Sequence, residues 1–125
     1  MSMARILIVE DQYLLALDLV EQLKEAGFEP LGPAPTVKEA LKILGQTECD
    51  AAILDVNLRN ENSSPIARAL EDRGKPYIVV SGYAGEQLPP GFRADRLLLK
   101  PVRPAELLTA LRGCLALSAA AAGGN

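Results

Sequence analysis

Histidine is absent from the 125 residues of this chain. Without an imidazole, the protein cannot build a Ser-His-Asp triad, a Cys-His pair or a histidine-ligated metal centre. Several classes of hydrolase and metalloenzyme are therefore excluded. Any chemistry at a site in this chain must depend on carboxylates, lysines and hydroxyl groups.

Cysteine and long apolar runs are scarce as well. The two cysteines, Cys49 and Cys114, have no CxxC spacing, so neither a disulfide framework nor a zinc site is indicated, and both are expected to be buried free thiols. The apolar run ILIV at 6–9 ends at Glu10 and Asp11, so it is too short for a signal peptide or for the roughly 20 residues that cross a bilayer. We therefore expect a cytoplasmic protein without a membrane partner.

Strong positive charge is also missing. The formal net charge is −3, and nucleic-acid binding needs a concentrated cationic surface, so nucleic acid is not expected as a ligand. Apolar residues make up 49% of the chain and charged residues 23%, which is typical of a soluble globular protein. A length of 125 residues leaves room for one domain.

The sequence does contain apolar runs that alternate with helical patterns. Buried-strand patterns occupy residues 4–10, 51–56, 77–82 and 96–100, and a proline-rich interval at 28–35 allows a short edge strand. Connections of helix length lie between them, so the strands are expected to be parallel and covered by helices on both faces. The predicted fold is α/β, a flavodoxin-like (βα)5 unit whose five strands have the order 2-1-3-4-5.

Local signals predict where the helices begin and end. Gly27 is expected to cap the end of the first helix. Thr36 and Glu39 form a capping box that starts the second helix. Ser64 is expected to be the N-cap of the third helix, with Pro65 as its first residue.

The later connections are less regular. Residues 57–63 are predicted to be a polar loop, and the prolines at 89–90 leave room for only one turn of a shortened fourth helix. A last helix is predicted at 104–119. The domain is therefore expected to span residues 1–119, and residues 120–125 are expected to form a frayed tail.

Polar side chains stand where four of the predicted strands end. In an open parallel sheet, ligands bind beyond the carboxyl ends of the strands. The residues at these ends carry carboxylate, hydroxyl or ammonium groups: Glu10 and Asp11, Asp55, Ser81 and Lys100. Their four strands are neighbours in the predicted order, so we expect these side chains to share one site.

The acidic residues of this predicted site indicate a metal. Glu10, Asp11 and Asp55 would form a cluster of three carboxylates, whose mutual repulsion favours a divalent cation. Mg²⁺ is the expected ion because it takes a few carboxylates together with water and phosphate oxygens. The backbone carbonyl of Asn57 is a further candidate ligand.

A carboxylate in such a site can attack phosphorus and form an aspartyl phosphate. Asp55 is the predicted nucleophile because it is central. Lys100 would supply a cation for one phosphoryl oxygen, and the hydroxyl of Ser81 would donate a hydrogen bond to another.

These residues together resemble the receiver domain of bacterial two-component response regulators, and the resemblance covers essentially the whole chain. It implies Mg²⁺-dependent phosphorylation of Asp55 by a phosphohistidine of a sensor histidine kinase or a histidine phosphotransferase. It also implies slow hydrolysis of the acyl phosphate, so that the domain catalyses only its own phosphorylation and dephosphorylation and is not an enzyme in the usual sense. A cis peptide bond between Lys100 and Pro101 is a further implication.

The resemblance also identifies a conformational switch. In this family, the hydroxyl at the end of the fourth strand moves toward the phosphoryl group, and an aromatic side chain three residues before the lysine turns inward. Ser81 occupies the first position, but Leu97 replaces the aromatic residue, and Tyr83 is the available substitute, although an exposed loop tyrosine without a switching role is equally compatible. The stretch PYIVVSGYAG at 76–85 partly resembles a subgroup of stand-alone alphaproteobacterial receivers with a Phe-Ala-Thr-Gly-hydrophobic-Tyr motif.

A single-domain response regulator is therefore the preferred interpretation. It would signal, or relay phosphate, through a downstream protein partner, as a monomer or weak dimer. Two alternatives remain open: a pseudo-receiver that binds partners without phosphorylation, and a small aspartyl-phosphate phosphatase. Asn57 stands where such a phosphatase would carry a second catalytic aspartate, which disfavours the latter.

Overall fold

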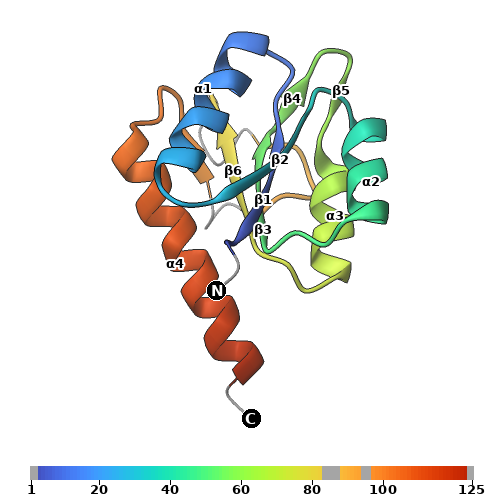
Figure 1. The fold of residues 1–125 in the computed structure, drawn as a ribbon. Helices are drawn as coiled ribbons and strands as arrows, with labels where there is room; N and C mark the ends of the chain where they lie inside the picture. Colours follow the sequence, from blue (N-terminus) through green and yellow to red (C-terminus); the bar gives the residue numbers. More distant parts are fainter. Residues whose placement is uncertain (1–2, 83–87, 94–96, 124–125) are drawn as a thin grey trace.

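The computed structural model describes residues 3–82, 88–93 and 97–123. At its centre is a parallel sheet of five strands in the order β2-β1-β3-β6-β7 (Figure 1). These strands are β1 (Arg5–Val9), β2 (Glu29–Ala34), β3 (Ala51–Asp55), β6 (Tyr77–Ser81) and β7 (Leu97–Leu99). When the five are counted along the chain, this order is the predicted 2-1-3-4-5, so the predicted topology is confirmed.

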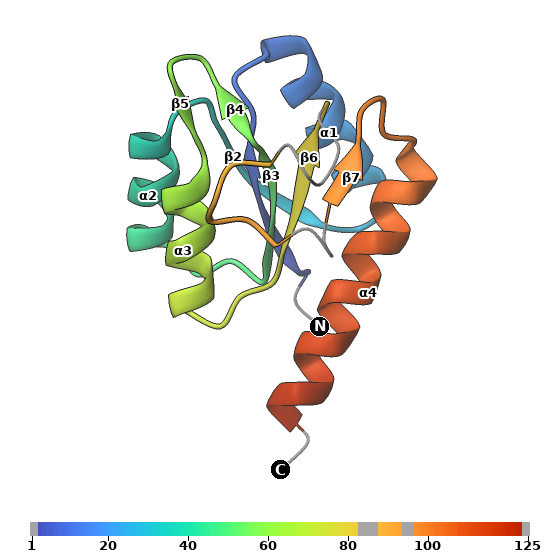
Figure 2. The same cartoon turned by 180° about the vertical axis from the view of Figure 1, so that it is seen from behind.

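Helices cover both faces of the sheet. One face carries α1 (Tyr13–Glu25) and α4 (Pro104–Gly123), and the other carries α2 (Val37–Gln46) and α3 (Ser64–Asp72) (Figures 1 and 2). The predicted flavodoxin-like α/β class is thereby confirmed. α4 remains helical through Gly123, beyond residue 119, where the last helix was predicted to end. Within the described ranges, no helix is both long enough and apolar enough to span a membrane.

Each face of the sheet has its own apolar core because successive side chains of a strand point to opposite faces. Leu54 and Val79 belong to the core under α2 and α3, which we call the α2/α3-side core. Ile53 and Ile78 belong to the α1/α4-side core. Every residue of β3 is buried, and a strand buried on both faces needs apolar residues at successive positions. A carboxylate at the end of β3 is therefore exceptional.

β2 is an edge strand that contains two prolines. The N–H of Glu29 donates to the carbonyl of Ala4, so by strand alternation the nitrogen of Pro30 faces away from β1, where a missing N–H costs no ladder bond. Gly32 has a φ of 92°, and a Cβ there would lie 2.8 Å from the nitrogen of Ala34. The strand spans six residues, which is longer than the short strand that the prolines predicted.

The loop after β3, for which only a polar loop was predicted, forms a small antiparallel hairpin. β4 (Asn57–Leu58) pairs with β5 (Glu61–Asn62). Leu58 is buried in the α2/α3-side core. The carboxylate of Glu61 accepts the backbone N–H of Val37 at 3.0 Å, at the start of α2. Both contacts come from distant parts of the chain, which is why local polarity did not reveal them.

Two of the three predicted helix ends are confirmed. Gly27, with a φ of 89°, follows the C-cap of α1, and Thr36 Oγ1 accepts the N–H of Glu39 at 3.1 Å at the start of α2. The N-cap of α3 is Ser63, so the predicted N-cap, Ser64, is instead the first helical residue. The side chain of Ser63 makes no capping hydrogen bond because its hydroxyl donates elsewhere.

Residues 88–93, after β6, form a turn and no helix. Leu88 and Phe92 pack against the α2/α3-side core. A Cβ at Gly91 would lie 3.0 Å from the Cβ of Ser64, so this segment passes close to the start of α3 (Figure 2). The rest of the segment predicted to form the shortened fourth helix, at 83–87 and 94–95, lies outside the described residues.

Candidate functional site

Three polar side chains are buried at the carboxyl edge of the sheet. Glu10, Asp55 and Ser81 expose only 5%, 6% and 1% of their surfaces. Burial of a charged group is costly unless hydrogen bonds or opposite charges compensate for lost hydration. Glu10 directly follows β1, while Asp55 and Ser81 are the last residues of β3 and β6, which are central strands of the sheet. The fold therefore gathers these groups at one point.

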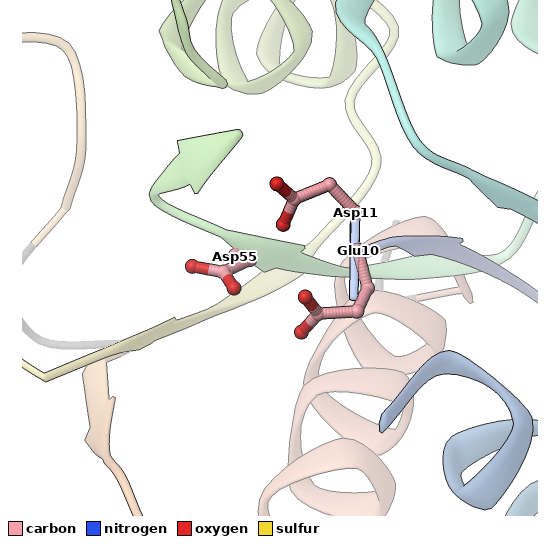
Figure 3. A group of neighbouring side chains, drawn as sticks. All are labelled: Glu10, Asp11 and Asp55. Carbon is pink, nitrogen blue, oxygen red and sulfur yellow. The ribbon is translucent and has the colours of Figure 1, made fainter. Parts of the chain in front are cut away.

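Glu10, Asp11 and Asp55 form a cluster in which one carboxylate oxygen from each lies within 4.8 Å of the others (Figure 3). The cluster arises because β1 pairs directly with β3. Burial raises the pKa of Glu10 from 4.5 to about 7; the hydrogen bond from Gln12 opposes this rise, and the negative charge of Asp55 adds to it. The three carboxylates thus carry more negative charge than this buried position readily tolerates.

Lys100 supplies the positive charge that faces this cluster. Its Nζ lies 2.8 Å from Asp55 Oδ2, and its side chain is 31% exposed. Burial alone would lower the pKa of Lys100, but the hydrogen bond to Asp55 and the charges of the three nearby carboxylates outweigh it and raise that pKa. The backbone N–H of Lys100 donates to the carbonyl of Ser81 at 2.8 Å. Lys100 is therefore positioned by the neighbouring strand β6.

Backbone N–H groups orient all three carboxylates. The donors and acceptors are Gln12 to Glu10 Oε2 at 3.0 Å, Arg59 to Asp11 Oδ2 at 2.9 Å, and Asn57 to Asp55 Oδ1 at 3.2 Å. Two of the three donors belong to the β4–β5 hairpin or to its turn. The hairpin thus borders the site as well as the start of α2.

The donor set fits a hard divalent cation. Clustered carboxylates suit Mg²⁺, which binds one or two carboxylates and keeps several water ligands. Burial, with the negative charge of Asp55 adding to it, raises the pKa of Glu10, and a dication would favour the charged form of this carboxylate. Asn57 begins β4, directly beyond the site, so its backbone carbonyl stays a predicted ligand.

The predicted switch residues lie in different surroundings. Ser81 is buried and pairs with Leu99 of β7. Leu97, where the family has an aromatic residue, is partly buried and packs against the α2/α3-side core. Tyr83 lies outside the described residues. The peptide bond between Lys100 and Pro101 is cis, as the family resemblance implies.

Ser63 is the contributor to this region that reasoning from the sequence missed. Its hydroxyl donates to the backbone carbonyl of Asp55 at 2.6 Å, and the residue is completely buried. A serine before Ser64-Pro65 reads locally as part of a helix start, so its position gave no signal of a contact with a residue eight positions earlier. Only the hairpin brings the two together.

A cavity of about 460 Å³ opens beside the cluster, between α1 and α4. Its lining includes Asp55 and Lys100 together with apolar side chains such as Leu19, Val80 and Leu107. The phosphoacceptor candidate is therefore bordered on this side by open apolar space.

The chain matches known proteins of the family that these residues indicate. Residues 6–112 match the family model of the response regulator receiver domain. The match covers most of the chain, and the protein belongs to this family of two-component signalling modules.

The curated relatives of this chain include several regulatory proteins. The transcriptional regulatory protein PdtaR of Mycobacterium tuberculosis is 30% identical over 111 residues, which cover 86% of this chain and 54% of that protein. The chain spans about half the length of the curated relatives that it matches, from 40% to 54%.

Two solved structures are informative. SdrG from Sphingomonas melonis Fr1 is 38% identical, with a TM-score of 0.78 and coverage of 92% of this chain and 99% of that one. The response regulator TrrA from Thermotoga maritima, solved in complex with Mg²⁺-BeF, is 26% identical, with a TM-score of 0.79 and coverage of 90% and 100%. In both, the similarity extends over nearly the entire domain.

Proposed function

We propose that this protein accepts a phosphoryl group on Asp55, in a Mg²⁺-dependent reaction, from the phosphohistidine of a sensor histidine kinase or a histidine phosphotransferase. The observation that carries this proposal is a buried carboxylate with an ammonium group at 2.8 Å and two further carboxylates gathered beside it. Membership of the receiver family, and the Mg²⁺-BeF complex of the similar TrrA, support the proposal.

The proposed reaction is a phosphoryl transfer between two proteins. A carboxylate oxygen of Asp55 attacks phosphorus, the phosphorus–nitrogen bond breaks, and its electron pair remains on the partner's imidazole. Lys100 shifts from the Asp55 carboxylate to an oxygen of the transferred group, and the Ser81 hydroxyl donates to another. Bound Mg²⁺, held by Glu10, Asp11 and Asp55, would neutralise charge on the phosphoryl oxygens. Water later hydrolyses the acyl phosphate, which returns the free carboxylate.

The start of α1 is the surface that we expect the phosphodonor to contact. Tyr13 and Leu14 expose 72% and 78% of their surfaces, and both lie within three residues of Asp11 along the chain. A partner that brings an imidazole to Asp55 must cover this rim. Exposed apolar side chains at that place favour docking of a protein surface that is itself partly apolar.

The proposed phosphoryl transfer also implies a wider biological role. The receiver unit, residues 1–119, would act in the cytoplasm and pass its state to a downstream protein. Segment 88–93 and Leu97 both contact the α2/α3-side core, so a change at Ser81 would be transmitted along that face. The domain would turn over no substrate other than its own phosphoryl group.

The test is labelling of Asp55→Asn with acetyl phosphate or a phosphorylated histidine kinase in the presence of Mg²⁺. We expect labelling to fall below detection, because an amide is not a nucleophile toward phosphorus. Asp50→Asn is the matched control, since the Asp50 carboxylate accepts the Arg5 N–H at 2.7 Å, at the opposite end of the sheet. Equal labelling of parent and Asp55→Asn would refute the assignment, and a parent that is never labelled would favour the pseudo-receiver alternative.

A further inference from the structure

We infer that Ser63 is a positioning residue, which fixes the position of the phosphoacceptor relative to the proposed metal ligands. This inference rests on the function proposed above. Ser63 is completely buried, and its hydroxyl donates to the main-chain carbonyl of Asp55 at 2.6 Å. This bond goes to the main chain of Asp55 and not to its carboxylate, so the proposed effect passes through the backbone.

The peptide group that joins Asp55 to Val56 is held at both of its polar atoms. Its carbonyl accepts the Ser63 hydroxyl, and its N–H, on Val56, donates to the carbonyl of Val80 in β6 at 3.2 Å. A peptide group fixed at both ends cannot rotate without breaking a buried hydrogen bond. The backbone angles on either side of it are therefore restrained.

Those angles determine where the main chain of Asn57 lies relative to the carboxylate of Asp55. The N–H of Asn57 donates to Asp55 Oδ1 at 3.2 Å, and its carbonyl is the proposed main-chain ligand of the cation. Rotation of the intervening peptide would move this carbonyl relative to the Asp55 carboxylate. Ser63 therefore preserves a geometry on which both cation binding and phosphoryl transfer depend.

Ser63 is itself held in place by the elements around it. Its N–H donates to the carbonyl of Val56 at 3.0 Å, and its own carbonyl accepts the N–H groups of Ile66 and Ala67 in the first turn of α3. The hydroxyl is thus positioned by main-chain hydrogen bonds at the start of a helix. Because this side chain makes no capping hydrogen bond, its removal by Ser63→Ala leaves the start of α3 with all of its main-chain contacts.

The experiment compares Ser63→Ala with Ser64→Ala. Ser64 is the matched control because its hydroxyl donates to Asn62 Oδ1 at 2.6 Å and not to Asp55. Mg²⁺ affinity is measured by NMR titration, and labelling with acetyl phosphate is measured at saturating Mg²⁺. Amide hydrogen exchange at Val56 and Asn57 is measured in the metal-free proteins, and thermal unfolding confirms that each variant is folded.

For Ser63→Ala we expect Mg²⁺ affinity and the maximal labelling rate each to fall roughly 3- to 10-fold, the equivalent of one lost hydrogen bond. The acetyl phosphate concentration at half-maximal rate should not change, since Ser63 does not face the donor. Exchange at Val56 should accelerate even without metal. A variant that is merely less stable, but still folded, would lose none of its Mg²⁺ affinity.

Two results would overturn the inference, and they are distinguishable. If the parent binds Mg²⁺ and is labelled, while folded Ser63→Ala stays within about twofold of Ser64→Ala in affinity, rate and Val56 exchange, the positioning role is refuted and the proposed function stands. If the parent neither binds Mg²⁺ nor is labelled, the proposed function and the role of Ser63 fail together.

Discussion

The two sides of the Asp55 residue are built differently. Toward α3, the hydroxyl of Ser63, the N-cap residue of that helix, holds the main-chain carbonyl of Asp55. Toward α1 and α4, the carboxylate borders a cavity of about 460 Å³, and the nearby start of α1 exposes Tyr13 and Leu14. One side is closed by a short polar contact, and the other is open and largely apolar.

This difference matches the two requirements of phosphoryl transfer between proteins. The acceptor must be oriented before the donor arrives, because positioning lowers the barrier. The donor must also reach it, so one approach has to remain free. By strand alternation Asp55 points to the same face as Ile53, which lies in the α1/α4-side core, so its carboxylate faces the open side.

The largest effect is expected for substitution of Lys100, whose charge lies at the boundary between the two sides of Asp55. Lys100→Met should slow labelling by acetyl phosphate about 100-fold, because a cation that stabilises the transferred group is lost. Lys75→Met is the control, since Lys75 is 26% exposed, close to the 31% of Lys100, and pairs with Glu48 instead. Equal rates for both variants, measured at saturating Mg²⁺, would show that Lys100 does not act on the phosphoryl group.

The pH dependence of Mg²⁺ binding tests the raised pKa of Glu10 within the cluster. Because the pKa of Glu10 is raised to about 7 in the metal-free protein, a proton must leave before the cation binds. Mg²⁺ affinity should therefore weaken about tenfold between pH 8 and pH 6. In Glu10→Gln the affinity should be lower but should vary much less over this range, and an NMR titration at each pH would measure it.

The same shift has a consequence for stability, with a defined sign. The folded pKa of Glu10, about 7, lies above its unfolded value of 4.5, so the folded state holds the proton more tightly. Its contribution to the free energy of unfolding is fully present below pH 4.5 and is lost as the pH rises to 7. Urea unfolding without Mg²⁺ should show this loss in the parent and not in Glu10→Gln.

The open side can be tested separately from the chemistry. Leu14→Ala should slow phosphotransfer from a phosphorylated histidine kinase roughly 5-fold at sub-saturating donor, since an exposed apolar contact is removed. Labelling by acetyl phosphate should not change. Leu117→Ala is the control, because Leu117 is 75% exposed and Leu14 is 78% exposed, but Leu117 lies far along α4. An equal loss with both donors would mean that Leu14 affects the site itself.

The smallest expected effect concerns the closed side. Glu61→Gln should lower the free energy of unfolding by about 0.5–1 kcal/mol, because a charged acceptor at the start of α2 is lost. Glu29→Gln is the comparison, since Glu29 pairs with Arg5 at 3.8 Å on the surface, and such pairs contribute little. Urea unfolding at neutral pH measures both. If the two variants are equally stable, the hairpin does not cap α2 in solution.

Much of this site could be predicted from residue order. Asp55 follows four buried apolar residues, and Glu10, Ser81 and Lys100 stand at the ends of neighbouring strands. Parallel strands bring their carboxyl ends to one edge, so a strand-end position in the sequence predicts a place in space. The fold class followed from the same alternation of strands and helices.

The hairpin and the contact of Ser63 depend on residues whose separation along the chain matches neither a helical nor a strand period. Residues 57–63 were predicted to be a polar loop, yet burial of Leu58 and the bond from Glu61 to α2 make them a hairpin. Ser63 and Ser64 look equivalent in the sequence, but only Ser63 reaches Asp55.

Strand patterns and strand-end polarity were thus enough to predict the sheet, the acidic cluster and its lysine, because these follow from local hydrophobicity and from one rule of parallel sheets. The path of the chain between the strands was not predictable in this way. The hairpin, the contact of Ser63, and the difference between the closed and open sides of Asp55 arise when segments distant in the chain share a small number of buried hydrogen bonds. Such bonds form only after the sheet has brought their donors and acceptors together.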